Sequence, residues 1–227
     1  MADFSKIKGF IFDLDGVIAD TSKYHSKAWH ELADELGVTW TKSLENGLKG
    51  IGRMDSLMMI LKAGNKEHAF NESEKNQLTT KKNDYYLTLI KGMTEEDVLP
   101  EITPFLEDLD AHHYKICLAS ASKNAPIILK KLNLVRFFAE VVDPTTLKKG
   151  KPNPEIFIRG AEQLNLRPEE CIGIEDAAAG IQAINDAGET SIGIGDADEL
   201  HAADINLAST KELTLKRIES ELNVKVK

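Results

Sequence analysis

The chain has 227 residues, 42% of them hydrophobic, which is enough for a packed core built as one large domain or as a domain with an inserted lobe. Its formal net charge of −9 at pH 7 argues against a nucleic-acid or anionic-membrane partner, because phosphates attract basic surfaces. Without an apolar stretch of about 18 residues or a signal-peptide pattern, the sequence indicates a cytoplasmic protein.

Six apolar runs with strand-like composition are spaced along the chain. They are residues 8–15, 114–120, 139–143, 171–176, 190–196 and 203–208, and helical patterns occupy 124–133, 153–165 and 176–188. Apolar strands that alternate with helices are typical of a parallel sheet covered on both faces. We therefore predict an α/β fold with a Rossmann-like parallel sheet. Cys117 and Cys171 lie within two of the runs and are expected to be small core residues, not a disulfide or a metal pair.

One region interrupts this alternation. Between about residues 22 and 92 the pattern is helical, with candidate helices at 24–37, 53–64 and 71–92. A helical lobe inserted after the first strand explains the pattern. We predict a core domain of residues 1–21 and 93–227, an inserted α-helical cap domain of residues 22–92, and connecting segments near 19–22 and 92–99.

The first strand ends in two aspartates, Asp13 and Asp15. The same spacing recurs at residues 108 and 110, in a helical pattern, and at 196 and 198, where we expect it to cap a helix that begins near residue 199. The first pair follows an almost wholly apolar run, so its carboxylates carry a desolvation cost that a structural role alone does not justify. Alternating strand geometry places both on one side, and Gly16 allows a sharp turn after them. The pair is therefore a candidate catalytic site.

Polar residues in three later segments are expected to lie near this pair. Ser120 and Ser122 end the second strand, Glu175 and Asp176 end a later one, and Lys151 lies in the segment KGKPNP. Ligands of parallel sheets bind at the carboxyl ends of the strands. Each residue also has a structural explanation: Ser122 as a helix N-cap, the two acids at a helix N-terminus, and the lysine as an ordinary surface residue. Their occurrence together favours one shared site.

The charges of these residues indicate the ligand. Four carboxylates in one crevice repel one another unless a divalent cation lies among them, and oxygen-only ligation favours Mg²⁺. We predict one Mg²⁺ per chain, held by Asp13, Asp15, Glu175 and Asp176. A lysine and a serine hydroxyl opposite the acids are suited to a phosphoryl group. The predicted chemistry is phosphoryl transfer.

These motifs resemble those of a known family. The sequence DLDG at 13–16, Ser120, Lys151 and Glu175-Asp176 are similar to the four motifs of the haloacid dehalogenase (HAD) superfamily, and the helical insertion resembles its cap domain. The segments YHSKAW, LKGIGRMDSL, KKNDYY, LASASKNAP and KGKPNPEIF extend the resemblance, over nearly the whole chain, to the β-phosphoglucomutase family. The resemblance implies a HAD-like core with Asp13 as a nucleophile that forms an aspartyl phosphate, and Asp15 as the general acid/base.

The same resemblance implies roles for further residues. Thr21 and His25 would link the hinge to Asp15. The substrate-binding residues would be Trp29, Gly50, Ile51, Gly52, Arg53, Ser56 and Lys82 in the cap and Ala121, Ser122, Lys123 and Asn124 in the core. Arg53, a planar bidentate donor, is suited to clamp a distal phosphate. Gly52 stands where this family has a serine, so a hydroxyl contact from that position is not carried over.

The implied reaction converts β-D-glucose 1-phosphate to D-glucose 6-phosphate, with glucose 1,6-bisphosphate as primer and intermediate. The partners would be small sugar phosphates, and the protein is expected to be a monomer. A hydrolytic sugar-phosphate phosphatase shares the first half-reaction and is an alternative. A phospho-accepting signalling domain is a more remote alternative, because it needs neither a helical lobe nor a Lys-Pro segment after the third strand.

Overall fold

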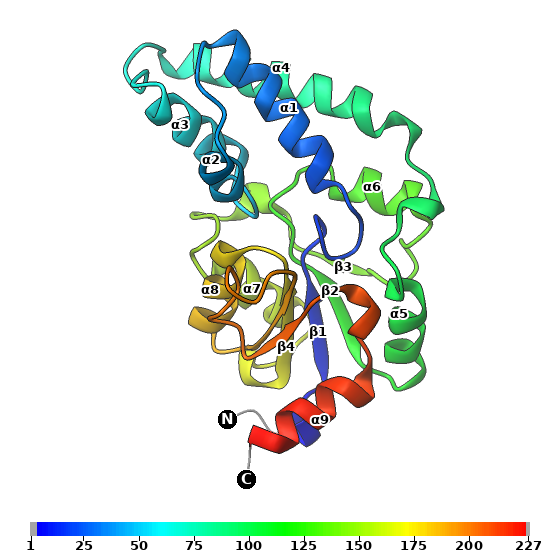
Figure 1. The fold of residues 1–227 in the computed structure, drawn as a ribbon. Coiled ribbons are helices and arrows are strands. Elements are labelled where there is room, and N and C mark those ends of the chain that lie inside the picture. Colours follow the sequence, from blue (N-terminus) through cyan, green and yellow to red (C-terminus); the bar gives the residue numbers. More distant parts are fainter. Residues whose placement is uncertain (1–3, 226–227) are drawn as a thin grey trace.

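The centre of the molecule is a parallel sheet (Figure 1). The computed structural model describes residues 4–225, with side chains up to residue 223. The strands are β1 (Gly9–Phe12), β2 (Lys115–Leu118), β3 (Glu140–Val141), β4 (Cys171–Glu175), β5 (Thr190–Ile194) and β6 (Ile205–Leu207), in the order β3-β2-β1-β4-β5-β6. Each predicted run contains one strand, which confirms the Rossmann-like α/β sheet. Cys117 in β2 and Cys171 in β4 are buried free thiols, as predicted.

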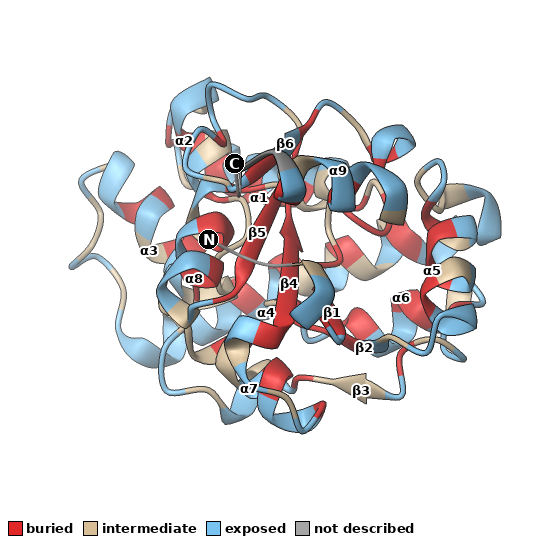
Figure 2. Cartoon of the chain, turned by 90° about the horizontal axis from the view of Figure 1, so that it is seen from below, coloured by how far each residue is buried: buried red, intermediate tan, exposed pale blue. Residues whose placement is uncertain are grey.

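Helices cover both faces of the sheet, and β1, β4 and β5 are buried between them (Figure 2). They are α5 (Ile102–Ala111), α6 (Ala125–Lys131), α7 (Glu155–Gln163), α8 (Ala178–Ala187) and α9 (Leu215–Lys225). Alternation along β1 explains the two layers: Phe10 and Phe12 pack against Phe105 of α5, while Ile11 packs on the opposite side with Phe157 of α7. Among the described residues, no helix is long and apolar enough to cross a membrane.

The helical insertion follows β1 and lies beyond one end of the sheet (Figure 1). It comprises α1 (Ser22–Glu35), α2 (Lys42–Gly47), α3 (Arg53–Ala63) and α4 (Glu72–Leu89), and residues 22–92, all described, include no strand. The short α2 is an addition to the three predicted helices; the side chain of Thr41 caps it by accepting from the backbone N–H of Leu44 at 3.1 Å. These helices bury an apolar cluster of their own, which includes Trp29, Leu57 and Ile60. This arrangement is an inserted α-helical cap.

The two segments that join cap and core run side by side. Ala19 and Val98 form an antiparallel bridge, and the backbone N–H of Leu99 donates to the carbonyl of Ile18 at 2.9 Å. Short 3-10 helices at Ile90–Gly92 and Glu95–Asp97 lead the second segment back to the core. Since the connectors are hydrogen-bonded to each other, a movement of the cap must involve both of them.

The expected helix near residue 199 is absent: within the described chain, residues 197–202 form turns. The side chain of Asp196 accepts from the backbone N–H of Asp198 at 2.8 Å, and the backbone N–H of Leu200 donates to the Asp196 carbonyl at 2.9 Å. Such local side-chain bonds stabilise a turn in competition with a continuing helix. The other Asp-x-Asp pair, at 108 and 110, lies in α5 as predicted.

Candidate active site

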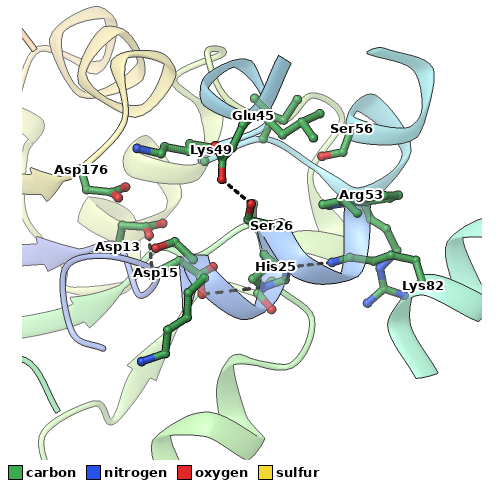
Figure 3. Close-up of a pocket in the computed structure, with 18 of the residues that line it drawn as sticks. Asp13, Asp15, His25, Ser26, Glu45, Lys49, Arg53, Ser56, Lys82 and Asp176 are labelled. Carbon is green, nitrogen blue, oxygen red and sulfur yellow. Dashed lines mark hydrogen bonds and ion pairs between the residues drawn. The ribbon is translucent and has the colours of Figure 1, made fainter. Parts of the chain in front are cut away.

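A cavity of about 280 Å³ lies between the cap helices and the ends of β1, β2 and β4 (Figure 3). The predicted site residues that line it are Asp13, Asp15, His25, Trp29, Gly50, Ile51, Arg53, Ser56, Lys82, Ala121, Ser122, Lys123 and Asp176. The other predicted residues each hydrogen-bond to one of these or to a bonded neighbour: Thr21, Gly52, Ser120, Asn124, Lys151 and Glu175. The structure therefore brings the whole predicted set together, although the individual roles remain predictions.

Asp13, at the end of β1, is held in place through both carboxylate oxygens. The ammonium group of Lys151 lies 2.6 Å from Oδ1 of Asp13 and 2.6 Å from Oε1 of Glu175. The backbone N–H of Asp15 donates to Oδ2 of Asp13 at 2.9 Å. Burial opposes the charge on Lys151, but the two carboxylates outweigh it and raise the lysine pKa. Lys151 is therefore a buried cation that orients Asp13, not a surface lysine.

Asp15 lies beside Asp13 in an environment suited to proton exchange. Burial raises the pKa of Asp15 to about 7, and the nearby Asp13 carboxylate adds to this effect. Thr21 opposes the shift by donating a hydrogen bond to Oδ1 of Asp15, and Nε2 of His25 lies 3.7 Å from the same oxygen. A carboxyl group with a pKa near neutrality populates both its protonated and its ionised form, which a general acid/base requires.

Three carboxylates from two strand ends converge on one point. Asp13, Glu175 and Asp176 can each direct one oxygen to a common centre, with these oxygens all within 4.8 Å of one another. Burial raises the pKa of both Glu175 and Asp176, and repulsion by the Asp13 carboxylate adds to both shifts. Lys151 compensates one of these charges, so the donor set fits a hard divalent cation with oxygen ligands. The side chain of Asp15 is not part of this cluster, so any ligand from Asp15 would be its backbone carbonyl.

Glycines allow the acids to lie so close to the backbone. Gly16 has a φ of 79°, and a Cβ at this position would lie 2.0 Å from Oδ2 of Asp176. At Gly180, in the first turn of α8, a Cβ would lie 1.9 Å from Oε1 of Glu175. Glu175 also accepts from the backbone N–H groups of Asp176 and Ala177, at 2.8 and 2.9 Å. Glu175 therefore both accepts hydrogen bonds near the N-terminus of α8 and belongs to the acid cluster, so the two explanations for this residue hold together.

Cationic residues occupy the opposite end of the cavity (Figure 3). Lys82 of α4 lies over the ring of Trp29, with Nζ 4.6 Å from the ring centre, and donates to Nδ1 of His25 at 2.8 Å. Burial and the neighbouring Arg53 lower the pKa of Lys82 to about 7. The pKa of His25 falls well below its ordinary value for similar reasons. A neutral imidazole that accepts at Nδ1 carries its hydrogen on Nε2, the nitrogen that faces Asp15.

Arg53 starts α3 and is connected to the core through a residue that the sequence did not single out. Its Nη2 donates to Oδ1 of Asn83 at 2.7 Å, and Nδ2 of Asn124 donates to the same oxygen at 2.9 Å. Asn124 is the N-cap residue of α6, and its backbone N–H donates to the hydroxyl of Ser122 at 3.3 Å. Ser122 is therefore not the N-cap of α6, as the sequence allowed, but accepts a hydrogen bond from the N-cap residue Asn124.

Further cavity-lining residues escaped the sequence reasoning. They are Asp20, Ser22, Lys23, Ser26, Trp40, Lys42, Glu45, Leu48 and Lys49. Helical periodicity offered a signal for Ser22 and Ser26, which share one face of α1 with His25 and Trp29. Lys49 directly precedes the predicted loop and is near enough to Asp176 to lower its pKa in part. Glu45, which accepts from Ser26, had no comparable signal.

The cap lies directly against the core at the acidic end of the cavity. A Cβ on Gly50 would lie 3.1 Å from Cβ of Ala177 and 3.6 Å from Oε1 of Glu175. Nearby, Nδ2 of Asn46 in α2 donates to Oε1 of Glu199 in the core at 2.7 Å. The loop that carries Gly50 therefore packs against the acidic end of the cavity.

Comparisons with known proteins agree with this geometry. A family model described as haloacid dehalogenase-like hydrolase matches residues 7–188. The β-phosphoglucomutase of Bacillus subtilis is 43% identical over 215 residues, which cover 95% of each chain. A crystal structure of the β-phosphoglucomutase of Clostridium difficile is similar with a TM-score of 0.93 and 44% identity, covering 97% of this chain and 99% of that one.

A more distant relative carries a different name. The phosphorylated carbohydrates phosphatase of Thermotoga maritima is 27% identical, over 80% of this chain and 82% of its own length. Both the family model and the relative from Bacillus subtilis extend over most of the chain, cap included. The chain therefore belongs to the haloacid dehalogenase-like hydrolases and, within them, to the family of the β-phosphoglucomutases.

Proposed function

We propose that the protein interconverts β-D-glucose 1-phosphate and D-glucose 6-phosphate. One observation carries the proposal: a single cavity has the Asp13 cluster at one end and the cations Arg53 and Lys82 at the other. A hexose bisphosphate has phosphoryl groups at both ends, and the cavity offers a site for each. The phospho-accepting signalling domain is not supported, because it has no use for the inserted helices that form the second site.

The chemistry at the first site follows from the two aspartates. In phosphorylated enzyme, the phosphoryl group passes from Asp13 to the 6-hydroxyl of β-glucose 1-phosphate, and Asp15 takes the hydroxyl proton. The resulting glucose 1,6-bisphosphate turns around in the cavity. Asp13 then attacks the phosphorus of the phosphate on C1. The bond between this phosphorus and the C1 oxygen breaks, and Asp15 returns its proton to that oxygen. The pKa of Asp15 near 7 suits both steps.

The acid cluster would hold Mg²⁺ through Asp13, Glu175 and Asp176, and when bound the ion neutralises charge on the phosphoryl group. Lys151 orients the carboxylate of Asp13. At the other end Arg53, Lys82 and Ser122 line the cavity where the second phosphate would lie. An arginine is suited to this role because its planar fork can bind two phosphate oxygens at once.

The remaining predictions are part of the same proposal. These are glucose 1,6-bisphosphate as primer, one Mg²⁺ per chain, a monomeric cytoplasmic protein, and a cap domain bounded by residues 22 and 92. The side-by-side connectors at Ala19 and Val98 support the cap boundaries. Sedimentation of the purified protein would test the monomer.

The decisive experiment measures product from each anomer of glucose 1-phosphate. With Mg²⁺ and bisphosphate primer, the β anomer should yield glucose 6-phosphate at a rate far above that for the α anomer. Release of free inorganic phosphate should remain a small fraction of turnover, because a mutase requires its cap to keep water from the aspartyl phosphate. Stoichiometric phosphate release without glucose 6-phosphate would instead establish the phosphatase alternative.

A further inference from the structure

Asn83 joins the cap to the core at the cationic end of the cavity. It lies in α4, next in sequence to Lys82. Its Oδ1 accepts two hydrogen bonds: one from Nη2 of Arg53 in the cap, at 2.7 Å, and one from Nδ2 of Asn124 in the core, at 2.9 Å. The two donors come from residues that the family resemblance assigns to substrate binding, although Asn83 itself does not line the cavity.

We propose that Asn83 is a positioning residue that holds Arg53 and Asn124 in place for the phosphate remote from Asp13. The inference rests on the proposed function, which requires a second phosphate site at this end. The bond from Asn124 crosses from core to cap, so any separation of the cap from the core would break it. Asn83 would therefore link closure of the cap to the orientation of the arginine.

The chemistry of the amide suits this role. Arg53 is close enough to Lys82 to lower the pKa of the lysine, and both side chains are partly removed from water, with the Asp84 carboxylate acting on Arg53 more weakly than burial does. A carboxylate between them would neutralise the charge that a phosphate needs. The amide oxygen of Asn83 fixes one of the five guanidinium N–H groups without cancelling the charge, and leaves the others for the ligand.

The test uses Asn83→Leu, which keeps the size of the side chain and removes the acceptor, with Asn83→Ala as a second variant. Loss of an acceptor for a charged donor should weaken the binding of glucose 6-phosphate, measured by calorimetry, on the order of 10- to 100-fold. KM for β-glucose 1-phosphate should rise by a similar factor, with a smaller change in kcat. Phosphorylation of Asp13 by acetyl phosphate, which has no remote phosphate, should stay within about threefold of wild type.

Two controls separate positioning from a general structural effect. Asn76→Leu makes the same change at an exposed position of α4 and should alter neither binding nor turnover. In an Arg53→Ala background, Asn83→Leu should weaken the binding of glucose 6-phosphate by a factor at least about fivefold smaller than in wild type. The reason is that one of the two side chains that Asn83 positions is already absent. Melting curves of each variant verify that it is folded.

Three results would overturn the inference. These are unchanged glucose 6-phosphate binding in a folded Asn83 variant, equal losses in the acetyl phosphate reaction, or fully additive losses in the Arg53→Ala background. Failure of the proposed function has a separate signature, since wild type would then form no glucose 6-phosphate from the β anomer. In that case the binding measurements still test Asn83, and a wild type that does not bind glucose 6-phosphate at all would overturn both.

Discussion

Replacing Lys82 by methionine should stabilise the fold while it disables the site. Lys82 is 4% exposed, and burial together with Arg53 lowers its pKa from 10.5 to about 7. The difference corresponds to roughly 4 to 5 kcal/mol of unfolding free energy lost at or below pH 7, since one pKa unit is about 1.4 kcal/mol. Methionine has a similar length, carries no charge and can pack against Trp29 and Tyr86.

Part of the stability that Lys82→Met gains by removing the buried charge is offset by lost contacts. Without Lys82, Nδ1 of His25 loses its hydrogen-bond donor, and a buried unpaired acceptor costs about 1 to 2 kcal/mol. The loss of the ammonium contacts with the two aromatic rings removes about 1 kcal/mol more. The net expectation for Lys82→Met at pH 7 is an increase of about 1 to 3 kcal/mol in the free energy of unfolding.

The pH dependence identifies the cause. Between pH 7 and 10.5 the unfolded chain keeps the lysine proton whereas the folded protein has lost it, so the stability of wild type rises with pH through this window. From pH 7 to pH 9.5 this contribution amounts to about 3 kcal/mol. Lys82→Met lacks this contribution, so the stability of the variant relative to wild type should decrease as the pH rises and finally become negative.

Denaturant unfolding at pH 7, 8 and 9.5 measures these differences on wild type, Lys82→Met and an exposed control, Lys81→Met. Lys81 forms an exposed ion pair with Glu35, so the control should change stability by no more than about 1 kcal/mol at every pH. Activity of Lys82→Met on β-glucose 1-phosphate should fall at least about 30-fold, because the cation beside Trp29 is lost. A variant less stable than wild type at pH 7, or an advantage independent of pH, would refute the reasoning.

Four further predictions test the site. Asp13→Asn should fold normally but lose more than about 99% of turnover and all acetyl phosphate labelling, and residual activity of several per cent would contradict its role as nucleophile. Chelation of Mg²⁺ should stop turnover, and Asp176→Ala should weaken Mg²⁺ binding at least about tenfold in a titration; full activity after exhaustive chelation would rule out the ion. Arg53→Ala should lower kcat/KM on the order of 30- to 1000-fold while acetyl phosphate still labels Asp13 at a near-normal rate, and equal losses would place Arg53 in the core chemistry. Gly16→Ala should cost about 1 to 3 kcal/mol of stability and weaken Mg²⁺ binding, because its Cβ would collide with Oδ2 of Asp176 at a φ of 79°; an unchanged unfolding midpoint would show that the turn relaxes.

The sequence by itself was sufficient for the sheet and for the acidic end of the site. Strands that are buried on both faces have to be apolar throughout, so each apolar run predicted a strand. The carboxyl ends of parallel strands lie at the same edge of the sheet. Asp13, Ser120 and Glu175 therefore had to lie near one another once the strands were recognised. The helical cap was equally visible, because a long stretch with the helical period contains no competing strand pattern.

Tertiary structure alone decided the contacts at the cationic end. Asn83 is one of many polar residues on a largely exposed helix, and nothing in the periodicity of α4 distinguishes it. Its two donors lie 30 and 41 residues away along the chain, so their meeting depends on how the cap packs on the core. The lowered pKa of Lys82 and the raised pKa of Asp15 depend on burial for the same reason. Local composition determines which residues can form strands and helices, whereas desolvation and hydrogen bonding between distant segments exist only after those elements have packed.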